Sequence, residues 1–486
     1  MLQPVILLFV LGTCSAVENP GIEITVNNKG LQYGKHAGAD WIQGILGNIT
    51  LPFMDGRIRV GCFSSLYYTF TDTRIRKCDL PEPSVEFSPE AAGLNMSISG
   101  LSVALTGEWM ASFSFLQSVG SFNMALFSVD VTSVVKLDRD NNGHLSVSSV
   151  SCEAHVENVD ISLSGGASWV FQALMNRHKS QFKQNIEDGI CPQVEKSIAN
   201  LEHYLQVMNV SFDVDHTLAV NLSLTASPDI NPSSLNVGLK GEFFSIQTHN
   251  DPPFEAQPFT VPVQGDYMFS VVLSEYTVNS ALYGYYSAGL FNIFINDSMI
   301  PPDFPVHLNT SSMGPYIPQL PKALLGLQMN LQVNATSVPM VTFQPDWAKQ
   351  SFHATAEAFA VQPNGTQTPL FQLRADSAFS GQSWIDAGKV KGNVSVDNFT
   401  LTLISSDVGP VNTKTLGKST REGIEMILTR VNEALSRGLD LPRLKRAKFV
   451  NSVLKVEQGF VSFFSDAEVW PTDRGFNRPK HTHEFF

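Results

Sequence analysis

The sequence predicts an α+β protein built from two similar halves, and three observations support this class. Much of the chain alternates apolar and polar residues, as in LSVAL (101–105) and VSVDNFTLTL (394–403), which is typical of antiparallel strands with one buried face. A few other segments place apolar residues at helical spacing instead. The stretches ITVNNKGLQYGKHAG (24–38) and VLSEYTVNSALYGYYSAG (272–289) are similar, which indicates a weak internal repeat.

The composition of the chain limits the classes of function that we expect. The chain has 486 residues, of which 43% are hydrophobic and only 16% charged, against about 25% charged residues in typical globular domains. Such a chain has much apolar surface to bury, or an apolar ligand to hold. The net charge of −13 repels the phosphates of nucleic acid, so we do not expect non-specific binding to nucleic acid.

The first residues predict secretion. Residues 1–16, MLQPVILLFVLGTCSA, have the apolar core and small-residue end of a signal peptide, so we expect an extracellular mature chain from residue 17. No later segment has eighteen uninterrupted apolar residues, so a membrane span is not expected. Ten N-x-S/T sequons fit glycosylation: Asn48, Asn95, Asn209, Asn221, Asn296, Asn309, Asn334, Asn364, Asn393 and Asn398.

Four cysteines remain after removal of the signal: Cys62, Cys78, Cys152 and Cys191. An even number in an oxidising compartment favours disulfides, and four cysteines allow three connectivities. Their spacing excludes CxxC metal or redox sites.

Turn and helix signals place the remaining elements. Asn-Gly pairs at 142–143 and 364–365 separate alternating runs and predict hairpin turns. Helical spacing predicts four helical segments: 28–47, 166–205, 277–295 and 415–437.

The first predicted helix carries three glycines on one stripe, Gly30, Gly34 and Gly38. Each glycine costs a helix about 1 kcal/mol relative to alanine. Packing must therefore hold this helix, and the bare stripe would let another surface approach its backbone closely.

A proline-rich stretch divides the chain. Pro252, Pro253, Pro258 and Pro262 cannot lie in a central strand, so we expect an extended linker or an edge strand over 246–264. The linker separates a first domain, 17–245, from a second, 265–469. The polar, aperiodic residues 470–486 are expected to be a disordered tail.

Catalytic and metal-binding motifs are weak or missing. The sequence has no G-x-S-x-G, H-E-x-x-H or GxxxxGK[ST] motif, so we expect no enzyme activity and no cofactor. DRDNNG (138–143) resembles half of an EF-hand, but the twelfth position is Ser149 rather than a bidentate Glu. Strand signals on both sides favour a hairpin turn there.

Several segments together resemble a known family. NPG (19–21), KGLQYG (29–34), SVSCEAHV (149–156), GICP (189–192), LNVGLKGEFFS (235–245), LSEYTVNSALY (273–283) and NDSMIPP (296–302) are similar to the family of bactericidal permeability-increasing protein and lipopolysaccharide-binding protein. The resemblance runs from Asn19 to about Val469. It implies an elongated two-domain boomerang, in which each domain wraps a twisted antiparallel sheet or barrel around a long helix and a central sheet joins the two.

The resemblance also implies an apolar pocket for phospholipid acyl chains in each domain. The first pocket is expected to use Leu31, Gly34, Gly38, Trp41, Ile45, Trp169, Phe182 and Ile186, and the second Val278, Leu282, Tyr286, Ile424, Ile427 and Val431. For any one of these residues, ordinary core packing is the competing interpretation. Cys152 and Cys191 match the family disulfide. Cys62 and Cys78 lie outside the family pattern, and we predict that they bridge two neighbouring strands of a hairpin.

The hairpin GEWMASFSFLQSVGSFNM (107–124) is the segment that differs most from the relatives. In the bactericidal and endotoxin-binding relatives this hairpin is rich in Lys and lies at the tip of the first domain, whereas here it has no Lys or Arg. MDGRIRVG (54–61) keeps Arg57 and Arg59. We expect a lipopolysaccharide tip made of Arg57, Arg59, Trp109, Phe113 and Phe115. The alternative is a solvated hairpin with Trp109 and Phe115 packed into the barrel.

The expected function is therefore lipid binding in innate defence. The protein would bind lipopolysaccharide (lipid A) at the bacterial outer membrane surface through its first domain and hold phospholipid in both pockets, with antibacterial activity against Gram-negative bacteria as a further expectation. The alternatives are a phospholipid transfer or carrier protein without bacterial recognition, and a regulatory module that kept the fold without lipid. Nucleic acid is not an expected partner.

Overall fold

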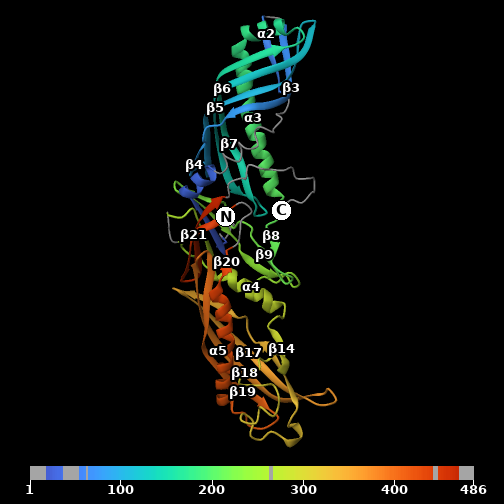
Figure 1. Cartoon of the computed structure of the whole chain (residues 1–486), viewed down its shortest axis with the longest axis vertical. Coiled ribbons are helices and arrows are strands. Elements are labelled where there is room, and N and C mark those ends of the chain that lie inside the picture. Colours follow the sequence, from blue (N-terminus) through green and yellow to red (C-terminus); the bar gives the residue numbers. More distant parts are fainter. Residues whose placement is uncertain (1–17, 37–53, 62–63, 262–265, 442–446, 470–486) are drawn as a thin grey trace, which may run out of the picture.

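The computed structural model describes residues 18–36, 54–61, 64–261, 266–441 and 447–469. The molecule is elongated, with one curled sheet and one long helix at each end and further sheets between them (Figure 1). Every strand pairing between described strands is antiparallel. The α+β class and the two-domain arrangement are confirmed.

The first half is a six-stranded sheet in the order β2-β3-β5-β6-β7, with β4 paired to β5. Its long strands curl around a helical face made of α2 (Ser168–Arg177) and α3 (Lys179–Gln206). The strands are β2 (Met54–Val60), β3 (Ser64–Asp79), β4 (Ser84–Ser88), β5 (Gly93–Phe113), β6 (Leu116–Arg139) and β7 (Leu145–Ser164).

The core of this half lies between the sheet and the two helices. Trp109, Phe171 and Phe182 are all at most 2% exposed. The rings of Trp109 and Phe171 lie 5.4 Å apart, and the indole nitrogen of Trp109 donates to the backbone oxygen of Ser164 at 3.1 Å. Gly120 lies opposite Trp109, and a Cβ there would be 2.7 Å from that nitrogen, so the indole needs a glycine across the strand pair.

The second half repeats this plan with a seven-stranded sheet in the order β14-β15-β17-β18-β19-β20, with β16 paired to β17. Its long helix is α5 (Thr413–Arg437), which packs on β19. The strands are β14 (Asn292–Asn296), β15 (Gln328–Ala335), β16 (Met340–Gln344), β17 (Trp347–Val361), β18 (Gln367–Asp386), β19 (Lys389–Ser406) and β20 (Leu439–Asp440), and the short 3₁₀ helices η1 (Asp297–Met299) and η2 (Lys322–Leu324) lie between β14 and β15.

A central sheet joins the halves and brings the two ends of the described chain together. Its order is β10-β11-β1-β13-β22-β21, so β1 from the start of the chain pairs with β13, and β13 pairs with β22 from the end. The strands are β1 (Ile22–Asn27), β10 (Asp229–Asn231), β11 (Ser234–Leu239), β13 (Phe269–Ser274), β21 (Ala447–Glu457) and β22 (Phe460–Val469).

The predicted internal repeat lies at this junction. β1 leads directly into a helix over 28–36, and β13 leads directly into α4 (Glu275–Ser287). β1 and β13 pair antiparallel, so the two copies of the repeat run side by side in opposite directions. A small sheet, β8 (Ser211–Asp213), β9 (Leu218–Asn221) and β12 (Glu242–Ser245), packs against α4.

Helix side chains cover the free edge of β7. The amide of Gln172 on α2 accepts from the backbone nitrogen of Leu163 at 2.8 Å and donates to the backbone oxygen of Ile161 at 2.9 Å. On α3, the carboxylate of Glu202 accepts from the backbone nitrogen of Val147. These contacts give exposed strand groups the partners that another strand would otherwise supply.

The opposite edge strand, β2, is covered in the same way. The backbone nitrogen of Arg59 donates to the Gln181 side chain at 3.0 Å, and the Asn185 amide donates to the backbone oxygen of Arg57 at 3.1 Å. Helix α3 thus closes the curled sheet along both edges.

The same device recurs in the second half. Asn432 on α5 both donates to and accepts from the backbone of Val394 on β19, and Asn279 on α4 does the same with Val341 on β16. We call the five side chains that cover strand edges in this way the edge amides: Gln172, Gln181, Asn185, Asn279 and Asn432.

Most of the local predictions are confirmed. The Asn-Gly pairs form the turns between β6 and β7 and between β17 and β18. Helices α2 and α3 occupy the predicted 166–205, and α5 occupies 415–437. The predicted helix over 277–295 is wrong at its end, because α4 stops at Ser287 and β14 begins at Asn292. Gly289 has φ +78°, which breaks the helix before the new strand.

One disulfide joins β7 to α3. Cys152 and Cys191 are bonded as predicted, across a sequence separation of 39 residues. The predicted Cys62–Cys78 disulfide is wrong, because Cys78 is a free thiol. Cys62 lies outside the described residues.

Of the first predicted helix, residues 28–36 are helical, and 37–47 lie outside the described residues. Of the described glycines in the stripe, only one is closely approached by another segment. A Cβ on Gly30 would lie 2.4 Å from the backbone oxygen of Met268, so another segment does approach there, whereas a Cβ on Gly34 would meet nothing within 4 Å.

The described helices include none that is both long enough and apolar enough to cross a bilayer. The same part of the chain holds no cluster of three or more metal-binding side chains. DRDNNG is a turn in which Asp140 accepts from the backbone nitrogens of Asn142 and His144.

Candidate functional site

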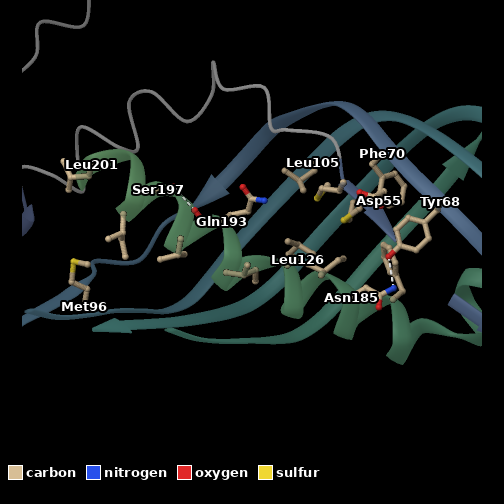
Figure 2. A pocket seen from close by; sticks show the side chains of 18 residues that line it. Asp55, Tyr68, Phe70, Met96, Leu105, Leu126, Asn185, Gln193, Ser197 and Leu201 are labelled. Carbon is tan, nitrogen blue, oxygen red and sulfur yellow. Dashed lines mark hydrogen bonds between the residues drawn. The ribbon is translucent and has the colours of Figure 1, made fainter. Parts of the chain in front are cut away.

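A cavity of about 740 Å³ lies between α3 and the curled sheet of the first half. Figure 2 shows it as an elongated space along α3, with Asp55, Tyr68 and Asn185 at one end and Met96 and Leu201 at the other. Its size falls within the range of about 300–1,000 Å³ that is usual for small-molecule sites.

The helix side of the cavity is a stripe of large apolar side chains at a spacing of four residues, which places them along one face. This stripe is Phe182, Ile186, Ile190, Val194 and Ile198, followed by Leu201. At a rise of about 1.5 Å per residue, the nineteen steps from Phe182 to Leu201 span about 28 Å.

The sheet side is equally apolar. Leu105 and Met124 are cross-strand partners on β5 and β6 and lie on the same face of the sheet. With them, the sheet wall comprises Met54, Phe70, Met96 and Leu126. A groove of this length and character suits an extended hydrocarbon chain, because two acyl chains end to end span a bilayer core of about 30 Å.

Polar groups gather at one end. The Asn185 amide donates to the phenolic oxygen of Tyr68 at 3.1 Å. Burial raises the pKa of the Tyr68 phenol above its usual value, with a further contribution from the Asp55 carboxylate, while the Asn185 hydrogen bond opposes this. Tyr68 therefore stays neutral. The described lining residues include one acid, Asp55, and no Lys or Arg.

The predicted residues of the first pocket are only partly brought together. Phe182 and Ile186 line the cavity. Leu31 packs instead in a neighbouring cluster with Ile198 and Leu205. Trp169 is wrong as a pocket residue, because it lies on α2 at the end of the molecule and is 78% exposed. Gly34 is not among the lining residues, and Gly38, Trp41 and Ile45 lie outside the described residues.

The residues predicted for the second pocket do not form one site. Val278, Leu282 and Tyr286 lie on α4, which packs on β12, β13 and β16 beside the centre of the molecule. Ile424, Ile427 and Val431 lie on α5, which packs on β19 in the second sheet. Ile427 and Val431 are 40% and 39% exposed.

Protein atoms fill the space beside the first part of α5. The ring of Phe304 packs so closely on the helix that a Cβ on Gly423 would lie 2.1 Å from it. Phe304 belongs to the segment between η1 and η2, whose side chains Met313, Tyr316 and Ile317 are also buried in the second core. The pair of pockets that the family resemblance implies is therefore not supported by the geometry of this half.

The aromatic residues of the hairpin at the end of the first half differ in their exposure to solvent. Trp109 is 2% exposed and belongs to the core, so its placement on a binding surface is wrong. Phe113 is half-buried against the same core. Phe115 lies in the turn between β5 and β6 and is 96% exposed. Trp109 is packed into the core, as the alternative interpretation expects, whereas the exposure of Phe115 contradicts that alternative.

Other exposed apolar residues lie on the strands of this end of the first half and on α2. Tyr67 pairs across the strands with Arg57, and Met110 pairs with Val119. The first turn of α2 starts beside β6, where the Ser118 hydroxyl accepts from the backbone nitrogen of Ala167. We call this set of exposed residues the apolar tip: Tyr67, Met110, Phe115, Val119 and Trp169.

Arg57 and Arg59 lie on the adjacent strand β2, both exposed. The Arg57 guanidinium donates to the Ser65 hydroxyl at 2.8 Å and lies 5.5 Å from the centre of the Tyr67 ring. Neither guanidinium forms an ion pair with any residue that the structure describes. Both are therefore available to an anionic partner.

The sequons lie on accessible strands and turns. Asn48 is outside the described residues. The five exposed asparagines are Asn95, Asn209, Asn364, Asn393 and Asn398, and Asn221, Asn296, Asn309 and Asn334 are half-buried.

The sheet wall of the cavity carries little sequence signal. The alternation at 101–105 does place Leu105 on the buried face, and Leu105 lines the cavity. No sequence pattern indicated that Met54, Met96 and Met124 would line the cavity. Which face of the sheet each methionine occupies depends on the register of its strand.

Comparison with known proteins covers nearly the whole chain. The family model described as the N-terminal domain of the LBP / BPI / CETP family matches residues 30–204, and the model of its C-terminal domain matches residues 212–469. The junction between the two matches lies before β8, earlier than the boundary near 245 that the sequence predicts.

Individual relatives are similar over most of their length. A bactericidal permeability-increasing protein of Sebastes schlegelii is 30% identical over 452 residues, covering 93% of this chain and 95% of the relative. A lipopolysaccharide-binding protein of Bos taurus is 28% identical, covering 95% and 96%. A crystal structure of lipopolysaccharide binding protein covers 93% of this chain and 100% of its own, with 25% identity and a TM-score of 0.53.

Proposed function

Because the chain belongs to the LBP / BPI / CETP family, we propose that it is a secreted lipid-binding protein of innate defence. It holds a phospholipid acyl chain in the cavity along α3, and its apolar tip and arginines bind lipopolysaccharide at the bacterial outer membrane. The cavity carries the proposal, since it is long, apolar and lined on both sides by residues of the first half.

The energetics support an acyl ligand. Each buried methylene contributes about 0.8 kcal/mol, so a chain that fills the groove binds without any charged contact. Asp55 at the end of the groove disfavours an anionic group there, so the phosphates of a bound lipid stay outside the cavity. The proposal leaves out a second pocket, because Phe304 and its neighbours occupy that space.

Filling the groove is expected to remove the ligand. In Ile186→Trp, a large ring occupies the second position of the stripe, and we expect the lipid that co-purifies with the full-length protein to fall close to zero. Native mass spectrometry of protein secreted from cultured cells measures this lipid directly. Ala199→Trp places the same ring on the exposed face of α3, outside the cavity lining, and should keep the lipid.

Thermal melting shows whether Ile186→Trp is still folded. Absence of lipid from the unmodified protein, or retention of lipid by a folded Ile186→Trp variant, would remove the acyl-chain proposal.

The tip is expected to recognise lipopolysaccharide by charge and by apolar contact together. Arginine binds phosphate bidentately, and each such contact to a charged group contributes about 1.5–3 kcal/mol. In Arg57→Ala/Arg59→Ala we expect affinity for lipid A, measured by fluorescence titration of the full-length protein, to fall at least tenfold. Arg374→Ala, in the second half, is the matched control.

Salt separates this function from its alternative, a phospholipid carrier without bacterial recognition. Binding through Arg57 and Arg59 should weaken as salt screens the phosphates, whereas acyl-chain binding should not. The absence of Lys and Arg from the hairpin favours the carrier, so this comparison is informative. Lipid A binding that is independent of both salt and the arginines would favour the carrier.

A further inference from the structure

A second cavity, of about 800 Å³, lies on the central sheet and shares no residue with the groove along α3. Strands β1, β11 and β13 and the turn before β11 form it together with residues 259–261 of the linker. Its lining includes residues of both halves of the chain, so the cavity exists only in the assembled molecule.

Strand alternation makes the floor of this cavity polar. In β1, Glu23, Thr25 and Asn27 lie on one face, while Ile22, Ile24 and Val26 lie on the other. Pairing continues the polar row across neighbouring strands, because Thr25 lies opposite Asn236 on β11 and opposite Ser270 on β13.

The lining is rich in neutral hydrogen-bonding groups. Nine of the fourteen lining residues carry a hydroxyl or a carboxamide: Thr25, Asn27, Asn28, Asn231, Ser233, Ser234, Asn236, Thr260 and Ser270. The hydroxyls of Thr25, Ser234 and Ser270 form no hydrogen bond within the described residues. Both donors and acceptors therefore remain available to a ligand.

Carboxyl groups outnumber cations at this cavity. Lys29 forms an ion pair with Asp466 at 2.8 Å. Burial, and then the nearby carboxylate of Asp229, raise the pKa of the Glu23 carboxyl above its usual value. No uncompensated cation lines the cavity, so a phosphate or carboxylate ligand has nothing to pair with.

Aromatic rings complete the site. Phe259 lies 5.5 Å from Phe460, and Phe269 lies 5.5 Å from Phe449, so packing fixes the positions of both rings. An apolar ring face beside amides and hydroxyls matches a sugar, which presents hydroxyl groups at its rim and carbon–hydrogen bonds on its faces.

The geometry points to a binding site for a neutral oligosaccharide on the central sheet, lined by Thr25, Asn236, Ser270 and Phe259. A peptide fits less well, because peptides add to sheets at a free edge. β11, β1 and β13 are all interior strands, so the cavity presents a sheet face and no unpaired strand. This site is independent of the proposed lipid function.

Saturation-transfer NMR on the full-length protein tests the proposal with two probes. One is the lipid-free, dephosphorylated O-polysaccharide of a Gram-negative lipopolysaccharide, and the other is a mannose oligosaccharide released from a glycoprotein. We expect signal transfer to the sugar protons of at least one probe, and the identity of that probe distinguishes a bacterial source from a host source. Binding of neither probe would overturn the proposal.

Thr25→Val/Asn236→Leu replaces two polar groups by apolar groups of similar shape. We expect about tenfold weaker sugar binding or more, from the loss of two hydrogen bonds. Thr25→Val alone, a single isosteric change, is the second variant should the pair fail to fold. Co-purifying lipid should be unchanged in these variants, and Ile186→Trp should keep sugar binding. Sugar binding that both folded variants retain in full would also overturn the assignment.

Discussion

Trp109→Ala is expected to lower the free energy of unfolding by about 3–5 kcal/mol, the usual cost of removing a fully buried aromatic ring. The indole is 2% exposed, packs on Phe171 and donates a hydrogen bond to Ser164. Its removal leaves a cavity beside Gly120, which has no side chain to fill the space. Hydrogen exchange of β5, β6 and α2 under increasing urea measures the loss in this half alone.

Phe115→Ala, six residues further along the same hairpin, is the matched control and should give the opposite pattern. Phe115 is 96% exposed, so its removal should change stability by less than about 0.5 kcal/mol. Binding to vesicles that contain lipopolysaccharide should instead weaken about tenfold or more, because a buried Phe contributes about 1.5–3 kcal/mol. Equal destabilisation by the two substitutions would contradict the structure of the hairpin, and unchanged vesicle binding by Phe115→Ala would contradict the role of the apolar tip.

Removing the disulfide should have a comparable effect on stability. Cys152→Ala/Cys191→Ala opens a loop with a sequence separation of 39 residues, and the chain-entropy relation gives a loss of about 4 kcal/mol. The effect should be confined to the first half, where β7 loses its covalent link to α3. Hydrogen exchange of β7 and α3 peptides, compared with β18 and α5 peptides, measures this difference.

Cys78→Ala is the control for the disulfide variant. Cys78 is a free, half-buried thiol at the far end of β3, so we expect little change in exchange anywhere. Destabilisation of the first half by Cys78→Ala as large as that by the disulfide variant would indicate that Cys78 is bonded after all.

The helices and turns were predictable because their signals are local. The four-residue spacing from Phe182 to Ile198 defines both α3 and the stripe that it presents to the cavity. The Asn-Gly turns and the strand–helix repeat at β1 and β13 likewise depend on short segments. The pocket itself was implied by the family resemblance, and of its predicted residues only Phe182 and Ile186 line the groove along α3.

The sheet wall and the second half were not predictable, because they depend on long-range register and packing. Strand β3 has irregular register with β5 between Thr71 and Arg74, and a shift of one residue reverses which side chains face inward. Phe304 belongs to a segment without clear periodicity, so nothing in its sequence indicates that it fills the space beside Gly423. Trp109 and Phe115 are both aromatic residues of one hairpin, and only the position of the turn separates the core residue from the exposed one.

The edge amides have a consequence for aggregation. An uncovered strand edge is a template for pairing with another chain. Gln181 and Asn185 shield β2, and Gln172 shields β7, only while α2 and α3 stay in place. Partial detachment of these helices would therefore expose two unpaired strand edges at once. Reduction breaks the disulfide between β7 and α3, so we expect reducing conditions to produce insoluble assemblies before the sheets themselves unfold.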